Sequence, residues 1–354
     1  MPGSLFSMQS HMKKIDQNGD ALTKIDLFVD FELFRPELEA ARERARGRGK
    51  KSNAGRPPFD VILLLKMLVI QSLYNLSDDA TEQMCLDRLS FQRFLGLQIG
   101  DPVPDAKTLW LFREALEPGD LIKTLFLKFD GFLRENGFEA QQGQIVDASI
   151  VKTRIRRDTR EVNEQVKNGD GANVKEWSEN TRRQKDLDAR WTRKNNKNYH
   201  GYKNHTGADV KDKLIRQYDV TPASVHDSNV YDPLITENTD PDEYADSAYI
   251  SEARMAKRTE AGKVPRFQEK GARGHPLTEG QKSANRERAR IRCRIEHIYG
   301  AQRQRAGDLI LRTVGIIHAR VKIGLRNLAY NLERYAFLKL PPRDKKVKCR
   351  VIVS

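Results

Sequence analysis

Three isolated acidic residues limit the possible folds of this chain more than any other feature of its sequence. They are Asp147 in the run 145–151, Asp246 in the run 243–249 and Glu296 in the run 292–299. The first two runs are typical of short β-strands, and a carboxylate buried in a strand is unfavourable unless it is paired or binds a metal ion. Three carboxylates gathered around hard cations are suited to cutting or joining phosphodiester bonds. The sequence therefore predicts an acidic metal site.

The charge of the chain points to a polyanionic partner. The 354 residues carry a formal net charge of +14, with 38% hydrophobic and 32% charged residues, and the sequence pI is about 9.6. Such a balance favours nucleic acid. A basic face kept for solubility, or a nucleic-acid binder without catalysis, would have the same charge.

The length and the cysteine content of the chain further limit the kind of protein it can be. A chain of 354 residues is long enough for two or three domains with a sizeable core. Its cysteines, Cys85, Cys293 and Cys349, are too scattered for a zinc knuckle. They favour a reducing, cytoplasmic setting without disulfides. The longest apolar run, 61–70, is broken by Lys66 and is shorter than the ~20 residues of a membrane span. No signal peptide is expected before it.

The N-terminal part is predicted to be a segment with a basic linker, 1–54, followed by an all-helical domain, 55–138. The linker residues, 44–56, suit a flexible connector or an arm that grips phosphates equally well. The expected helices are 59–73, a second that Ser77 caps and that ends near Leu89, a short third around 91–95 closed by Gly96, and a fourth at 106–116 capped by Asp105. This pattern is compatible with a helix-turn-helix DNA reader and with any small helical bundle.

The periodicity changes after residue 139, which predicts a mixed α/β domain over 139–340 and a basic tail at 341–354. Strands are expected at 144–152, 199–210, 214–221 and 243–248, with a helical stretch at 229–235 and a helix at 251–261 that Ser251 caps. Residues 153–198 are rich in Arg, Lys, Asn, Asp and Gln. That composition predicts an exposed, disordered insertion.

A long helix is expected around Glu296. Arg292 and Arg303 fall on its side, and Ile291, Ile295 and Ile298 form an apolar stripe about a third of a turn away. Glu296 is then either an ordinary surface partner of Arg292, or an acid at the edge of the core with arginines that reach phosphates on both flanks.

Ordered motifs accompany the three acids. They are Ile-Val-Asp-Ala-Ser-Ile-Val at 145–151, Tyr-His-Gly-Tyr-Lys-Asn-His-Thr-Gly-Ala-Asp at 199–209, Val-Thr-Pro-Ala-Ser-Val-His-Asp-Ser at 220–228, Ala-Asp-Ser-Ala-Tyr at 245–249 and Arg-Cys-Arg-Ile-Glu-His-Ile-Tyr-Gly at 292–300. Upstream stand Gly-Arg-Pro-Pro-Phe-Asp at 55–60 and Pro-Asp-Ala-Lys-Thr-Leu at 104–109. In this order, over 55–338, the chain resembles the DDE transposases of bacterial insertion sequences, specifically the insertion-sequence five group.

The resemblance implies an RNase H-like mixed-sheet catalytic domain. Asp147 would lie on its first strand, Asp246 near the end of the fourth and Glu296 on a later helix, as catalytic residues and ligands of two Mg²⁺ or Mn²⁺ ions. The enzyme would bind the ends of an insertion element, cleave the DNA and join the ends to target double-stranded DNA.

The resemblance also implies contacts and partners. Lys203, Tyr249, Arg292 and Arg303 are candidate DNA contacts, and a dimer or higher oligomer is expected when two ends are held together. His205 and His226 are either assistants near the site or structural residues. Two alternatives stay open: a non-catalytic DNA-binding derivative of a transposase, and a metal-dependent nuclease without strand joining.

Overall fold

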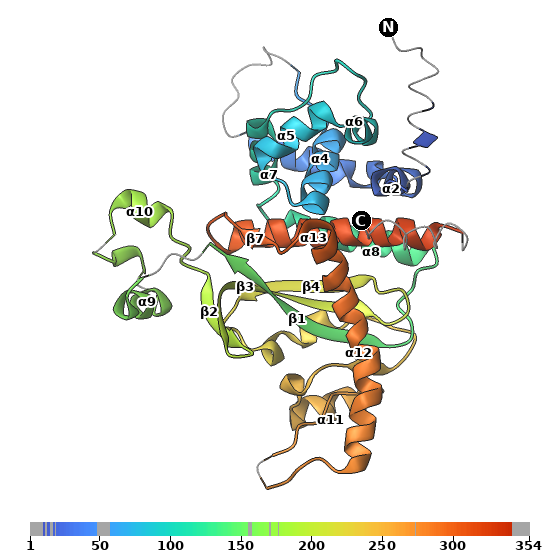
Figure 1. Cartoon of the computed structure of the whole chain (residues 1–354), viewed down its shortest axis with the longest axis vertical. Coiled ribbons are helices and arrows are strands. Elements are labelled where there is room, and N and C mark those ends of the chain that lie inside the picture. The colour runs from blue at the N-terminus through green and yellow to red at the C-terminus, as the bar shows by residue number, and fades with distance from the viewer. Residues whose placement is uncertain are drawn as a thin grey trace. The chain divides into compact units, whose positions relative to one another are not determined.

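In this computed structural model, the described residues are 10, 13–14, 17, 19–47, 57–154, 158–169, 171–175, 177–272 and 274–341. The chain divides into two compact units (Figure 1), of which the first contains Met1–Leu125 and Leu325–Ser354 and the second Phe126–Gly324. Helices α8 (Leu121–Glu135) and α13 (Ile316–Lys339) contribute to both. The predicted linker 44–56 and tail 341–354 lie largely outside the described residues.

The first unit is helical. Its elements are α2 (Ala21–Phe28), the 3₁₀ turn η1 (Phe31–Phe34), α3 (Arg35–Arg46), α4 (Val61–Tyr74), α5 (Asp78–Asp87), α6 (Leu89–Leu95) and α7 (Ala106–Ala115), together with parts of α8 and α13. Helix α4 is the central helix, because apolar residues surround most of its circumference and ten of its fourteen residues are buried.

Local signals set the ends of these helices as the sequence predicted. Ser77 accepts a hydrogen bond from the Ala80 amide, and Asp105 from the Thr108 amide. Gly96 ends α6 with φ 74°, a conformation that glycine adopts without strain. Helix α4 begins two residues later than predicted, because Asp60 caps it with a 2.7 Å hydrogen bond from the Ile62 amide.

No single described helix is long and apolar enough to cross a membrane. Among the helices that the structure describes, one pair, α4 and α5, passes that test of length and composition together, and the pair is bent by 105°.

The second unit is built on a seven-stranded mixed sheet. Its strands are β1 (Gln144–Thr153), β2 (Arg190–Lys194), β3 (Lys197–Asp209), β4 (Ile215–Pro222), β5 (Asp242–Tyr244), β6 (Val264–Pro265) and β7 (Ile310–Leu311). Strand β3 is antiparallel to β1 on one edge and to β2 and then β4 on the other. Strand β5 is parallel to β1, and β6 is parallel to β5. Strand β7 is also parallel to β1. The sheet thus combines four antiparallel strands, β1–β4, with three parallel ones, β5–β7, and together with its helices it confirms the predicted α/β class.

Helices and turns connect these strands. They are α9 (Arg160–Lys167), η2 (Gly171–Asn173), α10 (Glu179–Arg183), η3 (Asp227–Val230), η4 (Asp232–Leu234), η5 (Ser247–Tyr249), α11 (Glu252–Glu260) and α12 (Glu279–Ala306). Helix α12 runs past β1 and beyond the edge of the sheet (Figure 1). Ile295 and Ile298 are buried, with exposed fractions of 0% and 1%, and Ile291 is half-buried, so the predicted apolar stripe is the face that packs.

The insertion at 153–198 corrects the prediction of disorder. Apart from residues 155–157, 170 and 176, which lie outside the described residues, it contains α9, η2, α10 and β2. Val162, Val174 and Trp177 form a small core of their own, and Val166 and Leu187 pack against it. The composition suggested disorder because the segment contains few apolar residues and they are widely spaced. A core of this size needs no more than these.

Three smaller expectations were also wrong. The segment 229–235 is two 3₁₀ turns and not a helix, because Pro233 cannot continue one. Strand β5 ends at Tyr244, four residues before the predicted end. Ser251 precedes α11, but its side chain makes no capping hydrogen bond.

A buried ionic group joins α8, β3 and β4 within the second unit. The guanidinium of Arg216, which is 0% exposed, lies 2.9 Å from an Asp130 oxygen and 3.2 Å from an Asp209 oxygen. It also donates a 2.7 Å hydrogen bond to the Phe138 carbonyl. Burying three charges is tolerable here because each carboxylate has a guanidinium partner.

Candidate active site

The parallel register of β1 and β5 places two of the three acids side by side. Gln144 pairs with Glu243 and Ile145 with Tyr244. Asp147 and Asp246 each follow the last of these pairs by two residues, and neighbouring strands are about 4.8 Å apart. The carboxylates therefore stand at one level, where β5 has ended and β1 continues.

A tight turn holds Asp246. Its carboxylate accepts a 2.7 Å hydrogen bond from the Ala248 amide and so caps η5. One carboxylate oxygen is used in this way, which fixes the direction of the side chain and leaves the other oxygen for a ligand.

Helix α12, which carries the third acid, contacts Asp147. The Tyr299 hydroxyl donates to the Asp147 carbonyl at 3.1 Å, and an Arg292 nitrogen lies 3.9 Å from an Asp147 carboxylate oxygen. Arg292, Glu296 and Tyr299 follow one another by four and three residues and share one face of the helix. Glu296 thus points from the face of α12 that contacts Asp147, and its side chain is exposed.

The three carboxylates do not form a cluster in this structure. The described oxygens of Asp147, Asp246 and Glu296 do not all come within 4.8 Å of one another. The exposed Glu296 side chain can change rotamer without disturbing the core, since long surface side chains move on the picosecond to nanosecond scale.

Burial leaves the Asp147 charge poorly compensated. Desolvation raises the pKa of Asp147 to about 6, although Arg292 opposes the rise and Asp246 adds to it. The Tyr249 hydroxyl is buried nearby with no hydrogen-bond partner among the described residues. Burial raises the pKa of Tyr249 far above its usual value, and the charges of Asp227, Asp147 and Asp246 add to this. A desolvated carboxylate beside an unsatisfied phenol and further acids fits a hard cation.

A second buried group borders the site. The sequence pointed to Lys203 and His205 separately but did not connect either of them with Asp227. Lys203 lies 2.8 Å from an Asp227 oxygen and donates a 2.7 Å hydrogen bond to the Val225 carbonyl. His205 is 0% exposed, and its Nε2 lies 2.8 Å from the Thr221 hydroxyl. Desolvation lowers the pKa of His205 to about 4, so the ring is neutral at pH 7. A lysine inside an otherwise buried strand was the available signal for this group.

The four candidate DNA contacts differ in how far their side chains are exposed. Tyr249 is 0% exposed and belongs to a hydrophobic core, and the Lys203 side chain is 13% exposed and paired with Asp227. Both side chains are largely enclosed in this structure, and DNA contact by Lys203 and Tyr249 stays a prediction. Arg292 and Arg303 have side chains that are 22% and 67% exposed, and DNA contact by these two stays a prediction.

The two histidines have structural positions. His205 is enclosed within the sheet, as described above. His226 accepts a hydrogen bond from the Ser228 amide at 3.3 Å and caps η3. Neither position shows a direct role in catalysis.

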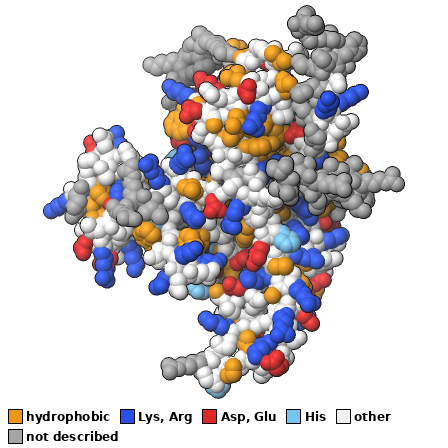
Figure 2. Space-filling view, viewed as in Figure 1, with side chains coloured by type: hydrophobic (Ala, Val, Ile, Leu, Met, Phe, Trp, Pro, Cys, Tyr) orange, Lys and Arg blue, Asp and Glu red, His pale blue; other side chains and the backbone are white. Residues whose placement is uncertain are grey.

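Basic side chains lie along α12 with acidic ones between them (Figure 2). Arg288 is bonded to the Phe267 carbonyl at 2.8 Å, and Arg294 to the Val210 carbonyl at 2.8 Å. Arg286 and Arg290, one turn apart, are exposed and have no side-chain partner in the described part of the chain. They are available for phosphates.

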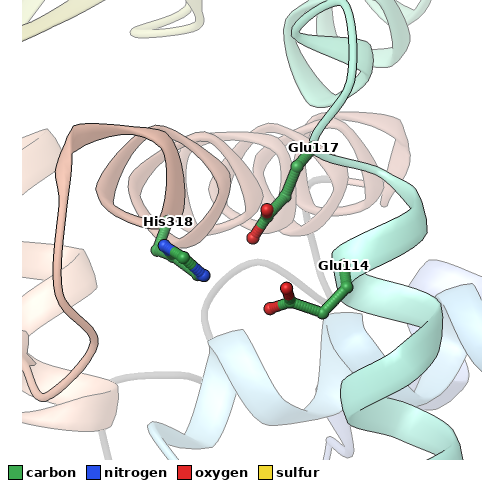
Figure 3. A group of neighbouring side chains, drawn as sticks. All are labelled: Glu114, Glu117 and His318. Carbon is green, nitrogen blue, oxygen red and sulfur yellow. The ribbon is translucent and has the colours of Figure 1, made fainter. Parts of the chain in front are cut away.

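Figure 3 shows two carboxylates and an imidazole outside this region. Glu114 and Glu117 come from the C-terminal end of α7 and the turn after it, in the first unit, whereas His318 comes from the first turn of α13, in the second. Because they belong to different units, they are not assigned to the acidic site of the second unit.

Comparison with known proteins assigns the chain to a family. The family model for a "Transposase domain (DUF772)" matches residues 9–115, and that for a "Transposase DDE domain" matches residues 139–332, which is more than half of the chain. A solved structure, the cryo-EM structure of piggyBac transposase synaptic complex with hairpin DNA, is similar over 93% of this chain and 78% of that chain, with 11% identity and a TM-score of 0.45. The mixed sheet, with its acids on β1, after β5 and on α12, has the RNase H-like fold of the DDE domain. This chain is a DDE transposase of the insertion-sequence type, a family that generally uses divalent metal ions.

Proposed function

We propose that this transposase binds the ends of an insertion element and catalyses metal-dependent cleavage and strand transfer with Asp147, Asp246 and Glu296. The observation that carries the proposal is the register of β1 and β5, which sets two carboxylates at one level. Helix α12, which carries Glu296, contacts Asp147 through Arg292 and Tyr299, and Glu296 would supply the third carboxylate.

The donor set suits Mg²⁺ or Mn²⁺, and we propose two ions. All three ligands are carboxylates, the hard oxygen donors that these cations prefer. When bound, the ions would lower the pKa of the attacking water or hydroxyl and stabilise the leaving oxygen. Around them, Asp246 is held by its bond to the Ala248 amide, and Tyr299 fixes α12 against β1. These fixed contacts orient the acids before DNA arrives.

The arginines of α12 would position the DNA backbone. Arg292 is beside Asp147, Arg303 is exposed farther along the helix, and Arg286 and Arg290 face solvent without acidic partners in the described ranges. Guanidinium groups bind phosphate oxygens in a forked geometry that fixes position but carries no base information.

Replacing Arg292 and Arg303 together by Ala is expected to weaken duplex binding and to lower the slope of log K against log salt by about one to two. Each lost phosphate contact removes about 0.9 from that slope. Fluorescence anisotropy over a range of salt concentrations measures it. The matched variant with Lys at both positions keeps the charge and should keep the slope. An unchanged slope in the Ala variant would make both arginines structural, Arg292 as a partner of Asp147 and Arg303 as a partner of Asp308.

A paired assay tests the function as a whole. DNA bearing candidate element ends is incubated with and without Mg²⁺, and cleavage and joining are scored separately. Metal-dependent cleavage followed by joining supports the proposal. Cleavage without joining would make the protein a nuclease, and binding without cleavage would make it a non-catalytic derivative. Sedimentation of the same mixture shows whether the expected dimer or larger assembly forms on the ends.

A further inference from the structure

A pocket separates the folded insertion from the sheet of the second unit. It has a volume of about 280 Å³ and is lined by insertion residues such as Asp158, Trp177 and Asp186, by Trp191 of β2, by His200 of β3 and by the ends of β1 and β7. Small-molecule pockets span ~300–1,000 Å³. The cavity lies at the lower limit of that range, which suits a group no larger than one nucleotide and excludes a folded partner.

The rim of the pocket is cationic and aromatic. Arg154 and Arg312 line it, are exposed, and have no side-chain partner among the residues the structure describes. The Trp191 ring is 42% exposed and lies with its centroid 5.0 Å from that of His200. Two unpaired guanidinium groups attract an anion, and an exposed indole offers a flat apolar surface to an aromatic ring.

The inner wall holds polar atoms whose hydrogen bonding is incomplete. One oxygen of Asp186 accepts from the Tyr202 hydroxyl at 2.7 Å and from the Ala189 amide at 3.0 Å. Its other oxygen and the Thr313 hydroxyl are buried without a partner in the described part of the chain. An unsatisfied buried acceptor is unfavourable, so a ligand that donates a hydrogen bond at this depth is preferred.

These features select one class of ligand. The Asp186 carboxylate repels an inorganic phosphate at the inner wall, whereas a purely apolar group leaves that carboxylate unsatisfied. A nucleotide matches each part: its phosphate faces the arginines at the rim, its base lies on Trp191, and a ring N–H or amino group of the base donates to Asp186.

We propose that this pocket binds one unpaired nucleotide of the DNA on which the transposase acts, an inference that rests on the function proposed above. Thr153, which lines the pocket, follows Asp147 by six residues in β1 and faces the same side of the strand. At ~3.3 Å per residue the separation is about 20 Å. That distance spans roughly six nucleotides of a duplex strand, so the base that enters the pocket is several nucleotides from the bond that is cut.

A binding experiment with two DNA probes tests the pocket. The probes are a labelled duplex with a single-stranded overhang of roughly six cytidines, and the same duplex whose overhang carries abasic residues. Anisotropy titrations of the full chain at fixed salt should show about tenfold tighter binding of the cytidine overhang, as expected for one stacked base. Trp191→Ala should remove this preference while leaving the affinity for a blunt duplex unchanged.

Two further variants complete the design. Trp110, which is 44% exposed on α7, provides the matched control: Trp110→Ala should keep the tenfold preference. Arg154→Gln with Arg312→Gln should weaken binding of both overhangs and lower the salt slope by about 0.7 for each lost phosphate.

Each result of this experiment is decisive. Equal affinity of the wild-type chain for the two overhangs, with blunt duplex still bound, would overturn the pocket and leave the proposed function standing. A preference that survives Trp191→Ala would place the base elsewhere and also overturn it. Failure to bind any duplex would overturn the pocket and the DNA-binding function together.

Discussion

Asp147→Asn is expected to reduce DNA cleavage to less than about one hundredth of the wild-type rate. Changing even an outer-shell partner of a metal ligand costs 10–100-fold, and Asp147 is proposed as a direct ligand. Asparagine keeps the shape of the side chain but has no charge. Cleavage of element-end DNA in Mg²⁺ measures the effect, and Asp232→Asn, an exposed acid on η4 with a side chain 52% exposed, is the control.

The same variant has a stability signature that separates a lost ligand from a lost fold. Burial raises the pKa of Asp147 to about 6, so without metal the charged form is less favourable in the folded than in the unfolded chain above that pH. The neutral Asn should therefore unfold in urea at the same concentration as the wild type or a higher one. The stabilisation that Mn²⁺ gives the wild type should disappear. Full activity, or a strongly destabilised variant, would contradict the role proposed for Asp147.

The other two acids need substitutions that respect their local structure. Asp246 caps η5 by accepting a hydrogen bond from the Ala248 amide, and Asn can make the same cap. Asp246→Asn therefore removes only the charge, whereas Ala would also remove the cap. Glu296 is exposed, and Glu296→Gln should leave stability unchanged. The three variants together therefore test chemistry rather than folding.

The sequence alone could nominate the three acids, because each is a lone carboxylate within a run of apolar or basic residues. What the sequence could not supply is the register. The alternation around Asp147 predicts a strand, but only the pairing of Ile145 with Tyr244 sets Asp246 beside it. Pairing between distant segments depends on the whole sheet and is not encoded in either segment alone. The orientation of the helix that carries Glu296 was easier to predict, because its apolar stripe at Ile295 and Ile298 determines which face is buried.

The candidate DNA contacts show a different limit. The family resemblance implied DNA contacts for Lys203 and Tyr249, yet both side chains are largely enclosed. A polar residue in a strand gives the same pattern whether it meets DNA or an internal partner such as Asp227. The prediction of disorder for the insertion was wrong for a related reason. The average composition of a segment does not reveal a core as small as that of Val162, Val174 and Trp177.

Arg216→Met is expected to lower the free energy of unfolding by about 3–5 kcal/mol. Removing one partner of a buried ionic group leaves the remaining charges uncompensated, and losses of that size follow. Arg216 is 0% exposed and lies between Asp130 and Asp209. Methionine fills a similar volume, so the loss comes from charge more than from a cavity. Urea unfolding measures it, and Arg193→Met, an exposed residue on β2, should change stability by less than about 0.5 kcal/mol.

The dependence of this loss on pH identifies the charge responsible. Burial raises the pKa of Asp209 to about 6, and Arg216 is the main influence that opposes the rise; without Arg216 the pKa should be higher still. A carboxyl whose pKa is raised by folding destabilises the folded chain when it is ionised, and that penalty diminishes as the pH falls through the folded pKa. The gap in stability between Arg216→Met and the wild type should therefore be larger at pH 8 than at pH 5. Asp130 retains Arg134 at 2.8 Å, so it contributes less to the change. An equal gap at both pH values would mean that Arg216 acts by packing and by its bond to the Phe138 carbonyl, and not by compensating Asp209.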